Sequence, residues 1–185
     1  MLQTPRLYAR SWDVEADVEP VVSMYSHPEV VRFIGNRLIE TPQAARVFIQ
    51  FRIDRTEESG GVYGSWALIE RASNTVIGNI LLKPLPGEGR VPTRHIEIGW
   101  HLARRAWGNG YATEAGHAML ARAFGPLGLA RVHAVTEPGN TSSMAVMRRL
   151  GMKSLGQSTA FYDGLLVEHF EVSADSFLQA NERLA

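Results

Sequence analysis

The sequence predicts one α/β (α+β) domain built on a mixed, mostly antiparallel sheet of about seven strands flanked by helices. The 185 residues suit one domain spanning residues 1–185. Paired alternating segments around short turns predict hairpins, and segments with apolar residues at helical spacing lie between them. Hydrophobic residues make up 45% and charged residues 21%, which excludes a disordered or fibrous chain.

The first third of the chain is expected to be mainly helical. A strand over 6–12 precedes a helix over 14–26, for which Asp13 is the expected N-cap. Pro28 suits the first turn of a short helix ending at Phe33. Thr41-Pro42 begins a longer helix, which the polar, glycine-rich loop over 57–61 ends. The apolar residues that recur at helical spacing in that longer helix are Ala44, Val47, Phe48 and Phe51.

The rest of the chain alternates strands with two helices. Residues 84–90 are rich in turn formers, and Gly151 is a natural residue to follow a helix end. Asp163-Gly164 predicts a tight hairpin turn. The expected elements are strands over 62–70, 75–82, 95–102 and 130–136, helices over 110–124 and 140–150, and a final pair of strands over 154–162 and 165–173.

Charge and composition exclude several functions. The chain has 19 basic and 19 acidic residues, so a dedicated nucleic-acid or anionic-membrane binder is not expected. It has no cysteine, which excludes disulfides, thiolate metal sites and a cysteine nucleophile. Its six histidines show no metal-ligand spacing, so no metal is expected. No G-x-S-x-G elbow is present, which argues against covalent catalysis.

The location of the protein can be anticipated from the same data. No segment approaches the roughly 20 apolar residues that cross a bilayer. The first ten residues, M-L-Q-T-P-R-L-Y-A-R, lack the apolar centre of a secretion signal. A cytoplasmic protein is therefore expected, and a homodimer is the commonest symmetric oligomer.

The segment R-A-W-G-N-G-Y-A-T over 105–113 is the most informative part of the sequence. It follows an expected strand and opens an expected helix, whose first amides have no partner within the helix. Those donors and the positive end of the helix dipole make an anion site. Gly108 and Gly110 let a phosphate approach the backbone closely. The alternative is that the glycines only form a turn.

Two common phosphate-binding loops do not fit this segment. A P-loop requires G-K-[ST], but Tyr111 follows the second glycine. The dinucleotide fingerprint requires glycine or alanine where Thr113 stands, and its loop follows the strand directly. A nucleotide-binding protein therefore remains only a weak alternative, which NAD or ATP binding would revive.

The pattern R-x-x-G-x-G-Y-A-T-E-A resembles the GNAT superfamily of acetyl-CoA-dependent N-acetyltransferases. Within it the chain is most similar to the RimJ/RimL-type branch, which acetylates protein N-termini and other amines. The resemblance covers nearly the whole chain and implies a GNAT domain that uses acetyl-CoA as co-substrate. The further segments that carry it, in order, are T-P-R-L-Y-A-R-S-W, H-P-E-V-V-R-F-I-G, G-S-W-A-L-I-E with V-I-G-N-I, E-I-G-W-H-L and P-G-N-T-S-S-M-A-V-M-R-R-L-G-M.

The resemblance implies which residues bind the cofactor. The end of the strand over 95–102 would pair with the pantetheine arm like an added strand. Asn140 matches the family asparagine that contacts this arm, and it is equally expected to cap the following helix. The residues expected to bind acetyl-CoA are Trp100, His101, Leu102, Arg105, Gly108, Asn109, Gly110, Tyr111, Ala112, Thr113 and Asn140.

Acyl transfer to an amine needs a base and a proton for the thiolate. His95, Glu97, Gly99 and His101 share the polar face of the strand over 95–102. Glu97 is the expected base and His95 the alternative. Many GNAT enzymes have a tyrosine acid on the late helix, but Met147 stands there. In the resembled branch the N-x-x-S serine is proposed instead, which is Ser143; its alternative role is a backbone contact in the helix.

The acceptor is the least defined part of the prediction. Freeing an α-amine of pKa about 8 at pH 7 costs about 1.4 kcal/mol, against roughly 4.6 for a lysine. A carboxylate base in a partly open groove therefore suits a peptide N-terminus or a small-molecule amine. The aromatic candidates for the acceptor side are Tyr25, Phe33 and Phe161. Because Met147 replaces the tyrosine, a non-catalytic acyl-CoA-binding sensor or partner module is the alternative function.

Overall fold

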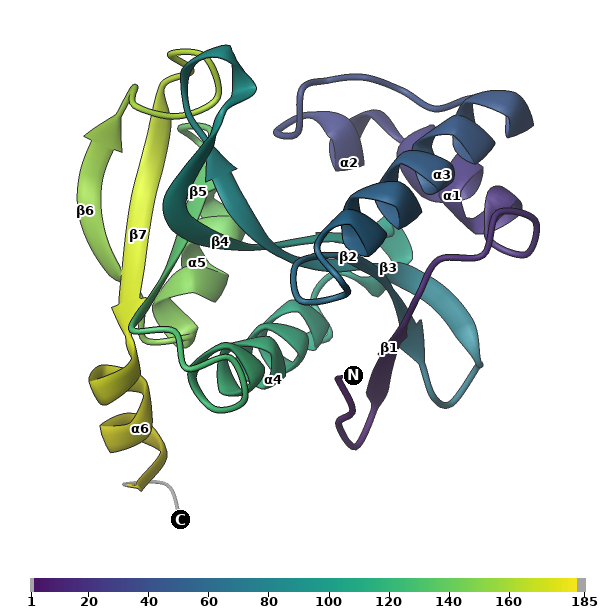
Figure 1. The fold of residues 1–185 in the computed structure, drawn as a ribbon. Coiled ribbons are helices and arrows are strands. Elements are labelled where there is room, and N and C mark those ends of the chain that lie inside the picture. Colours follow the sequence, from purple (N-terminus) through teal and green to yellow (C-terminus); the bar gives the residue numbers. More distant parts are fainter. Residues whose placement is uncertain (1, 183–185) are drawn as a thin grey trace.

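The predicted fold class is confirmed by a computed structural model that describes residues 2–182. A seven-stranded mixed sheet runs through the molecule, with helices on both faces (Figure 1). The strands are β1 (Leu7–Arg10), β2 (Gly64–Glu70), β3 (Thr75–Pro86), β4 (Pro92–Leu102), β5 (Arg131–Thr136), β6 (Lys153–Ser158) and β7 (Val167–Ser173). The helices are α1 (Val18–Tyr25), α2 (Pro28–Val31), α3 (Pro42–Glu58), α4 (Tyr111–Phe124), α5 (Thr141–Arg149) and α6 (Ala174–Glu182).

The sheet has the order β1-β2-β3-β4-β5-β7-β6. Only β4 and β5 run parallel, and their register contains a single pair, Glu97 with His133. The other neighbouring strands are antiparallel. Because β4 pairs with β3 from Lys83 to Gly78 but with β5 at one point only, β4 and β5 diverge beyond Glu97 (Figure 1). This divergence leaves one edge of β4 without a strand partner over its last residues.

Two apolar cores lie on opposite faces of the sheet. The larger core packs α4 and α5 against the strands, with Leu82, Ile98 and Leu120 at its centre. The smaller core packs α1, α2 and α3 against the first strands, around Val21 and Ile49. No helix among the described residues is long and apolar enough to cross a membrane.

The first helix predicted in the N-terminal third differs in detail from the one observed. The helix expected from residue 14 begins at Val18, because residues 14–17 form a turn whose amides donate to Asp13. The carboxylate of Asp17 is already engaged by Arg10 and the amide of Asp13. Asp13 therefore caps this turn rather than α1.

Of the apolar face predicted for the helix at residue 42, only Phe48 packs on the smaller core, and the rest of the prediction is wrong. Val47 and Phe51 are 61% and 54% exposed, whereas Ala45 and Ile49 are fully buried. The face that packs on the sheet is therefore turned by about one residue from the one expected, and it includes Arg52. The helix also continues to Glu58, into the expected loop, because Thr41 caps it well and no glycine occurs before Gly60.

Other boundaries shift where tertiary pairing extends a strand. Pro84 and Pro86 belong to β3 rather than to a turn, because both pair with β4. The strand expected over 154–162 ends at Ser158. Helix α6 was not predicted; it begins directly after β7 and packs Phe177 into the larger core.

Gly78 is required by the approach of two backbones. A Cβ at this position would lie 2.2 Å from the carbonyl oxygen of His101 and 2.6 Å from Leu102. Gly78→Ala is therefore expected to lower the free energy of unfolding by about 3 kcal/mol, as overpacking does. Thermal unfolding of the two proteins measures this loss. The control is Gly128→Ala, where a Cβ meets nothing within 4 Å and only the strain of a φ of +60° is added; a loss in Gly78→Ala no larger than in this control would contradict the clash.

Candidate active site

The loop between β4 and α4 presents unbonded amides at the N-terminus of a helix. Gly108 and Gly110 both have φ of +78°, and Gly110 is the N-cap of α4 without a side-chain cap. Among residues 2–182, no hydrogen bond acceptor is described for the backbone amides of 108–113. The positive end of the α4 dipole lies at the same place, so the loop is suited to an anion.

The N-terminal segment holds this loop in position. Arg6 donates to the carbonyl of Asn109 and to Glu114 of α4, and its guanidinium lies over the ring of Tyr111. Thr4 also donates to Glu114. The hydroxyl of Tyr111 donates to Glu70 on β2. These contacts fix the loop through side chains and leave its amides free.

The side chain of Arg105 points away from the open amides. It donates to the carbonyl of Val76 at 3.0 Å, which ties the loop to the start of β3. Trp107 donates its indole N–H to the carbonyl of Leu102. Any contribution of Arg105 to anion binding would therefore come from its main chain.

The end of β4 has a free edge beside the loop. The amide of Ala103 donates to Ile77 and that of His101 to the side chain of Asn79, so odd-numbered residues bond toward β3. The backbone groups of Trp100 and Leu102 therefore point to the opposite edge of β4, from which β5 diverges. An extended ligand can add to such an edge as a strand does.

Asn140 caps α5, which is one of the two roles expected for it. Its side-chain oxygen accepts from the amide of Ser143 at 3.2 Å, and its amide group donates to Thr136. No hydrogen bond of the Ser143 hydroxyl is described among residues 2–182, so this hydroxyl is not tied to the helix backbone. Met147 on the same helix is 1% exposed and packs in the larger core.

Glu97 lies in the middle of β4 and is buried rather than solvated. Its Oε2 atom accepts from the hydroxyl of Tyr162 at 2.5 Å and lies 2.9 Å from Nζ of Lys83. Lys83 also donates to the Tyr162 hydroxyl. Two donors therefore hold Oε2, while no hydrogen bond to Oε1 is described in the same part of the chain. No hydrogen bond joins Glu97 to Ser143 or to His95 there.

Tyr162 is a site residue that the sequence did not reveal. It belongs to the β6–β7 loop, which reaches over β4 because the Tyr162 amide donates to Pro86 and Asp163 pairs with Arg90. Burial, followed by the charge of Glu97, raises the pKa of Tyr162 far above its usual value, so it stays protonated. Its place beside an expected turn was the only signal available, and that signal is weak.

Three histidines form a chain across β4, β5 and β7. Nδ1 of His95 lies 3.1 Å from Nε2 of His133, whose Nδ1 lies 3.1 Å from Nε2 of His169. Burial, helped by the positive charges around it, lowers the pKa of His133 to about 4. Because His133 uses both ring nitrogens within this row, the three rings do not converge on one point as metal ligands would.

The buried state of His133 predicts an acid-sensitive stability. Between pH 6.5 and 4 the unfolded chain binds a proton there and the folded chain does not, so unfolding becomes easier as pH falls. The contribution is at most about 1.4 kcal/mol per pH unit. His133→Gln should flatten this slope, measured by chemical denaturation at several pH values. A slope equal to that of the unchanged protein would contradict the prediction.

His101 and the three aromatic candidates have different surroundings. Burial lowers the pKa of His101 to about 3, and its Nδ1 lies 2.9 Å from the Tyr25 hydroxyl. Tyr25 is 2% exposed and belongs to the smaller core. Phe161 is also buried, against His95 and His169, and Phe33 is half-buried beneath Arg32. Tyr25 and Phe161 are therefore chiefly packing residues.

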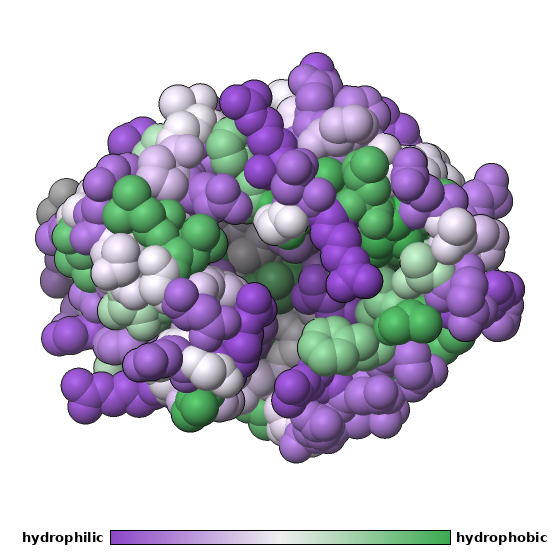
Figure 2. Space-filling view, turned by 90° about the horizontal axis from the view of Figure 1, so that it is seen from above, coloured by the Kyte–Doolittle hydropathy of each residue, from purple (hydrophilic) through white to green (hydrophobic). Residues whose placement is uncertain are grey.

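Figure 2 shows the molecule hollowed at the centre of one face. In Figure 1 this face lies between the tips of the β3–β4 and β6–β7 connections and the helices α2 and α3. The polar face of β4 extends from Glu97, covered by Tyr162, to His101, covered by Tyr25 of α1. Seen from above, the hollow lies between the β6–β7 loop and the N-terminal helices.

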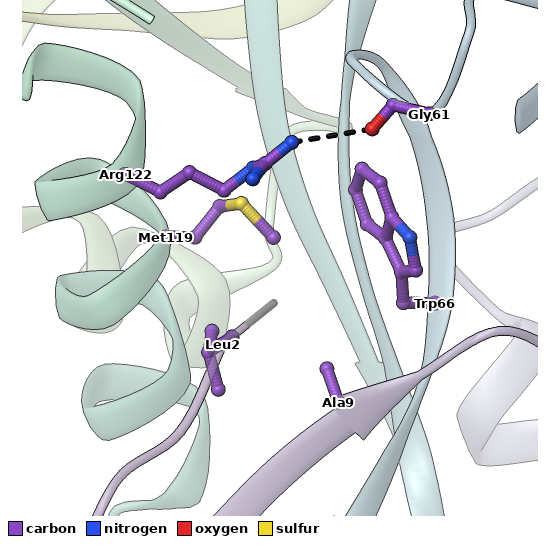
Figure 3. A pocket seen from close by; sticks show the side chains of 6 residues that line it. All are labelled: Leu2, Ala9, Gly61, Trp66, Met119 and Arg122. Carbon is purple, nitrogen blue, oxygen red and sulfur yellow. Dashed lines mark hydrogen bonds between the residues drawn. The ribbon is translucent and has the colours of Figure 1, made fainter. Parts of the chain in front are cut away.

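Two cavities lie elsewhere. One of about 190 Å³ opens between α4 and β2, where Arg122 reaches the carbonyl of Gly61 beside Trp66 and Met119 (Figure 3). It contains none of the expected site residues. The other, of about 350 Å³, adjoins the loop at Arg6 and Tyr111.

A loop of open amides, a free strand edge and a buried carboxylate on that strand lie together on this fold, an arrangement suited to a transferase that takes an acyl group from a diphosphate-bearing thioester. A family model described as an acetyltransferase (GNAT) domain matches residues 6–153. The chain therefore belongs to the GNAT acetyltransferases, a family of acetyl-CoA-dependent enzymes, and the expected family is confirmed.

The chain is similar to several named proteins. The uncharacterized N-acetyltransferase p20 of Bacillus licheniformis is 31% identical over 156 residues, which cover 84% of this chain and 83% of that protein. A GNAT-family acetyltransferase from Bacillus anthracis has a similar structure, with a TM-score of 0.76, 24% identity and coverage of 94% and 98%. RimL, a ribosomal L7/L12 alpha-N-protein acetyltransferase solved with coenzyme A, has a TM-score of 0.75 at 16% identity, with coverage of 94% and 97%.

Proposed function

We propose that this enzyme transfers the acetyl group of acetyl-CoA to a primary amine by direct attack, with Glu97 as general base. One observation carries the proposal: the open amides of 108–113 adjoin the free edge of the same strand that bears Glu97. A ligand with its diphosphate at the loop and its arm along β4 would bring its thioester toward this carboxylate.

The cofactor-binding part of the proposal assigns two roles. The amides of Gly108 to Thr113, with Arg105 through its main chain, grip the diphosphate. Trp100, His101 and Leu102 line the β4 segment that pairs with the pantetheine arm. Asn140 caps α5 and donates to Thr136 at the end of β5, and we assign it a contact with the same arm, made when its bond to Thr136 is exchanged.

The chemical step uses the free oxygen of Glu97. The amine nitrogen attacks the thioester carbonyl carbon while Oε1 of Glu97, directly or through water, accepts a proton from that nitrogen. The tetrahedral intermediate then breaks the carbon–sulfur bond, and the sulfur leaves as a thiolate that takes up a proton. Lys83 and Tyr162 hold Oε2 and so orient the carboxylate.

Ser143 is the proposed donor of that last proton. Its hydroxyl lies in the first turn of α5 without a described partner among residues 2–182, which supports this role. A thiol of pKa near 8.5 leaves fairly easily, so the proton can also come from water. His95 remains the alternative base.

The acceptor is proposed to be a protein N-terminal α-amine or a small-molecule amine. The carboxylate base and the similarity in fold to an alpha-N-protein acetyltransferase favour these classes. The test is a panel of N-terminal peptides, amino acids, amino sugars and polyamines with acetyl-CoA, followed by thiol release. No thiol release above hydrolysis with any amine would contradict the proposed transfer.

A further inference from the structure

Arg52 occupies a position on α3 where a charged side chain is unusual. The residues of α3 that face the sheet recur at helical spacing, and Ala45 and Ile49 among them are fully buried. Arg52 follows in the same stripe, before Thr56, whose hydroxyl accepts from the Ser65 amide on β2. The guanidinium of Arg52 therefore leaves the helix toward the sheet, and not toward the open surface as that of Arg55 does.

The guanidinium of Arg52 has no anionic partner. Its Nε is buried without a hydrogen-bond partner, and no ion pair of Arg52 occurs among residues 2–182. Its described contact is with the face of Phe48, at 4.7 Å from the ring centre. A buried donor without an acceptor costs about 1–3 kcal/mol, and more when it is charged. Such a group normally has a partner, and none is described within residues 2–182.

Arg52 is connected to the polar face of β4 through contacts between two aromatic side chains. Phe48, on which it stacks, packs on Tyr25 at 4.8 Å, and Tyr25 contacts His101 of β4. Burial raises the pKa of Tyr25 and Tyr162 and lowers that of His101; the positive charge of Arg52 opposes the first two shifts and adds to the third, so its field reaches both ends of the polar face of β4. Lys83, the other cation at this face, is already paired with Glu97.

We infer that Arg52 is a specificity-determining residue that binds an anionic group, carboxylate or phosphate, of the amine acceptor. The inference rests on the proposed function. The guanidinium presents paired donors that match the oxygens of either group. With Glu97 receiving the amine and Arg52 the anion, the hollow selects acceptors that carry both charges, and plain alkylamines and polyamines are poor substrates.

The test compares acceptors that differ only in that anion. Amino acids and N-terminal peptides with an acidic second residue are compared with their carboxamide counterparts, and phosphorylated amines with the corresponding alcohols. Each is assayed with the unchanged enzyme, Arg52→Met and Arg52→Lys. Methionine keeps the packing on Phe48 without charge, and lysine keeps the charge without the planar donor pair. The matched control is Arg55→Met, on the same helix, where Arg55 is exposed and pairs with Glu58.

The expected result is a higher kcat/KM for the anionic member of at least one pair, by about 10-fold or more. Arg52→Met should remove that preference through KM while leaving the neutral acceptor unchanged, Arg52→Lys should restore part of it, and Arg55→Met should have no effect. Comparison of the carboxylate pairs with the phosphate pairs shows which of the two anions Arg52 binds. Equal kcat/KM within every pair, or equal losses for both members in Arg52→Met, would overturn the inference.

A second measurement separates this inference from the proposed transfer. Calorimetry of an N-acetylated amino acid and its carboxamide requires no turnover. Tighter binding of the carboxylate, lost in Arg52→Met, supports the anion site even if no amine is acetylated. Absence of any difference between the two ligands in the unchanged protein contradicts the anion site even if amines are acetylated.

Discussion

Acetyl-CoA binding is expected to weaken at least about 100-fold in Gly110→Glu, because a carboxylate would stand where the diphosphate must lie and like charges in contact cost several kcal/mol. Gly110 has φ of +78° and caps α4, and a Cβ there would lie 3.6 Å from Nη2 of Arg6. The substitution thus adds charge and backbone strain at the same point. Titration calorimetry with acetyl-CoA measures the loss.

Two further variants separate the charge from the strain. Gly110→Ala carries the strain of a positive φ without the charge and should weaken binding far less. Gly128→Glu adds the same charge at another glycine of positive φ, in open space beyond α4, and should bind acetyl-CoA normally. Unchanged acetyl-CoA affinity in Gly110→Glu would remove the loop from the cofactor site.

Turnover is expected to fall about 100-fold or more in Glu97→Gln, within the range that general-base catalysis contributes. Glutamine keeps the shape and can still accept from Tyr162 and Lys83, but it cannot take the amine proton. Acetyl-CoA affinity should not change, because the proposed cofactor contacts are main-chain groups of β4 and the loop and the side chain of Asn140, none of which belongs to Glu97. Steady-state kinetics and calorimetry together test both statements.

The control for Glu97→Gln is a glutamate at the same level of the sheet on another strand. Glu171 of β7 pairs in register with His133, as Glu97 does from β4, but it has no place in the proposed chemistry. Glu171→Gln should therefore retain most of the turnover. If Glu97→Gln turned over acceptor as fast as the unchanged enzyme, His95 would replace Glu97 as the candidate base.

The surroundings of Glu97 on β4 illustrate what sequence periodicity can and cannot predict. Alternation along β4 correctly separated Ile98 and Leu102, which are buried in the larger core, from Glu97 and His101 on the other face. It could not predict that Glu97 would be buried, because Lys83 reaches it from the paired strand β3 and Tyr162 from the β6–β7 loop. The groups that set its environment are 14 and 65 residues away in the chain.

Helix α3 shows the same limit. Its apolar residues recur at helical spacing on two overlapping faces, and the sequence alone favoured the one containing Val47 and Phe51. Packing on β2 instead selected Ala45 and Ile49, because small and compact side chains let the helix approach the sheet. Burial of this face also turned the side chain of Arg52 toward the sheet, and no local sequence pattern predicted this orientation.

The amino-acid sequence by itself determined the class of fold, the family and the loop proposed to bind an anion, since hairpin turns, helix caps and closely spaced glycines act within a few residues of each other. Which side chains meet around Glu97, which face of α3 is buried and where β4 parts from β5 were decided only by the tertiary structure. Those features depend on contacts between distant segments, whose free energies become defined only once the whole sheet has been assembled.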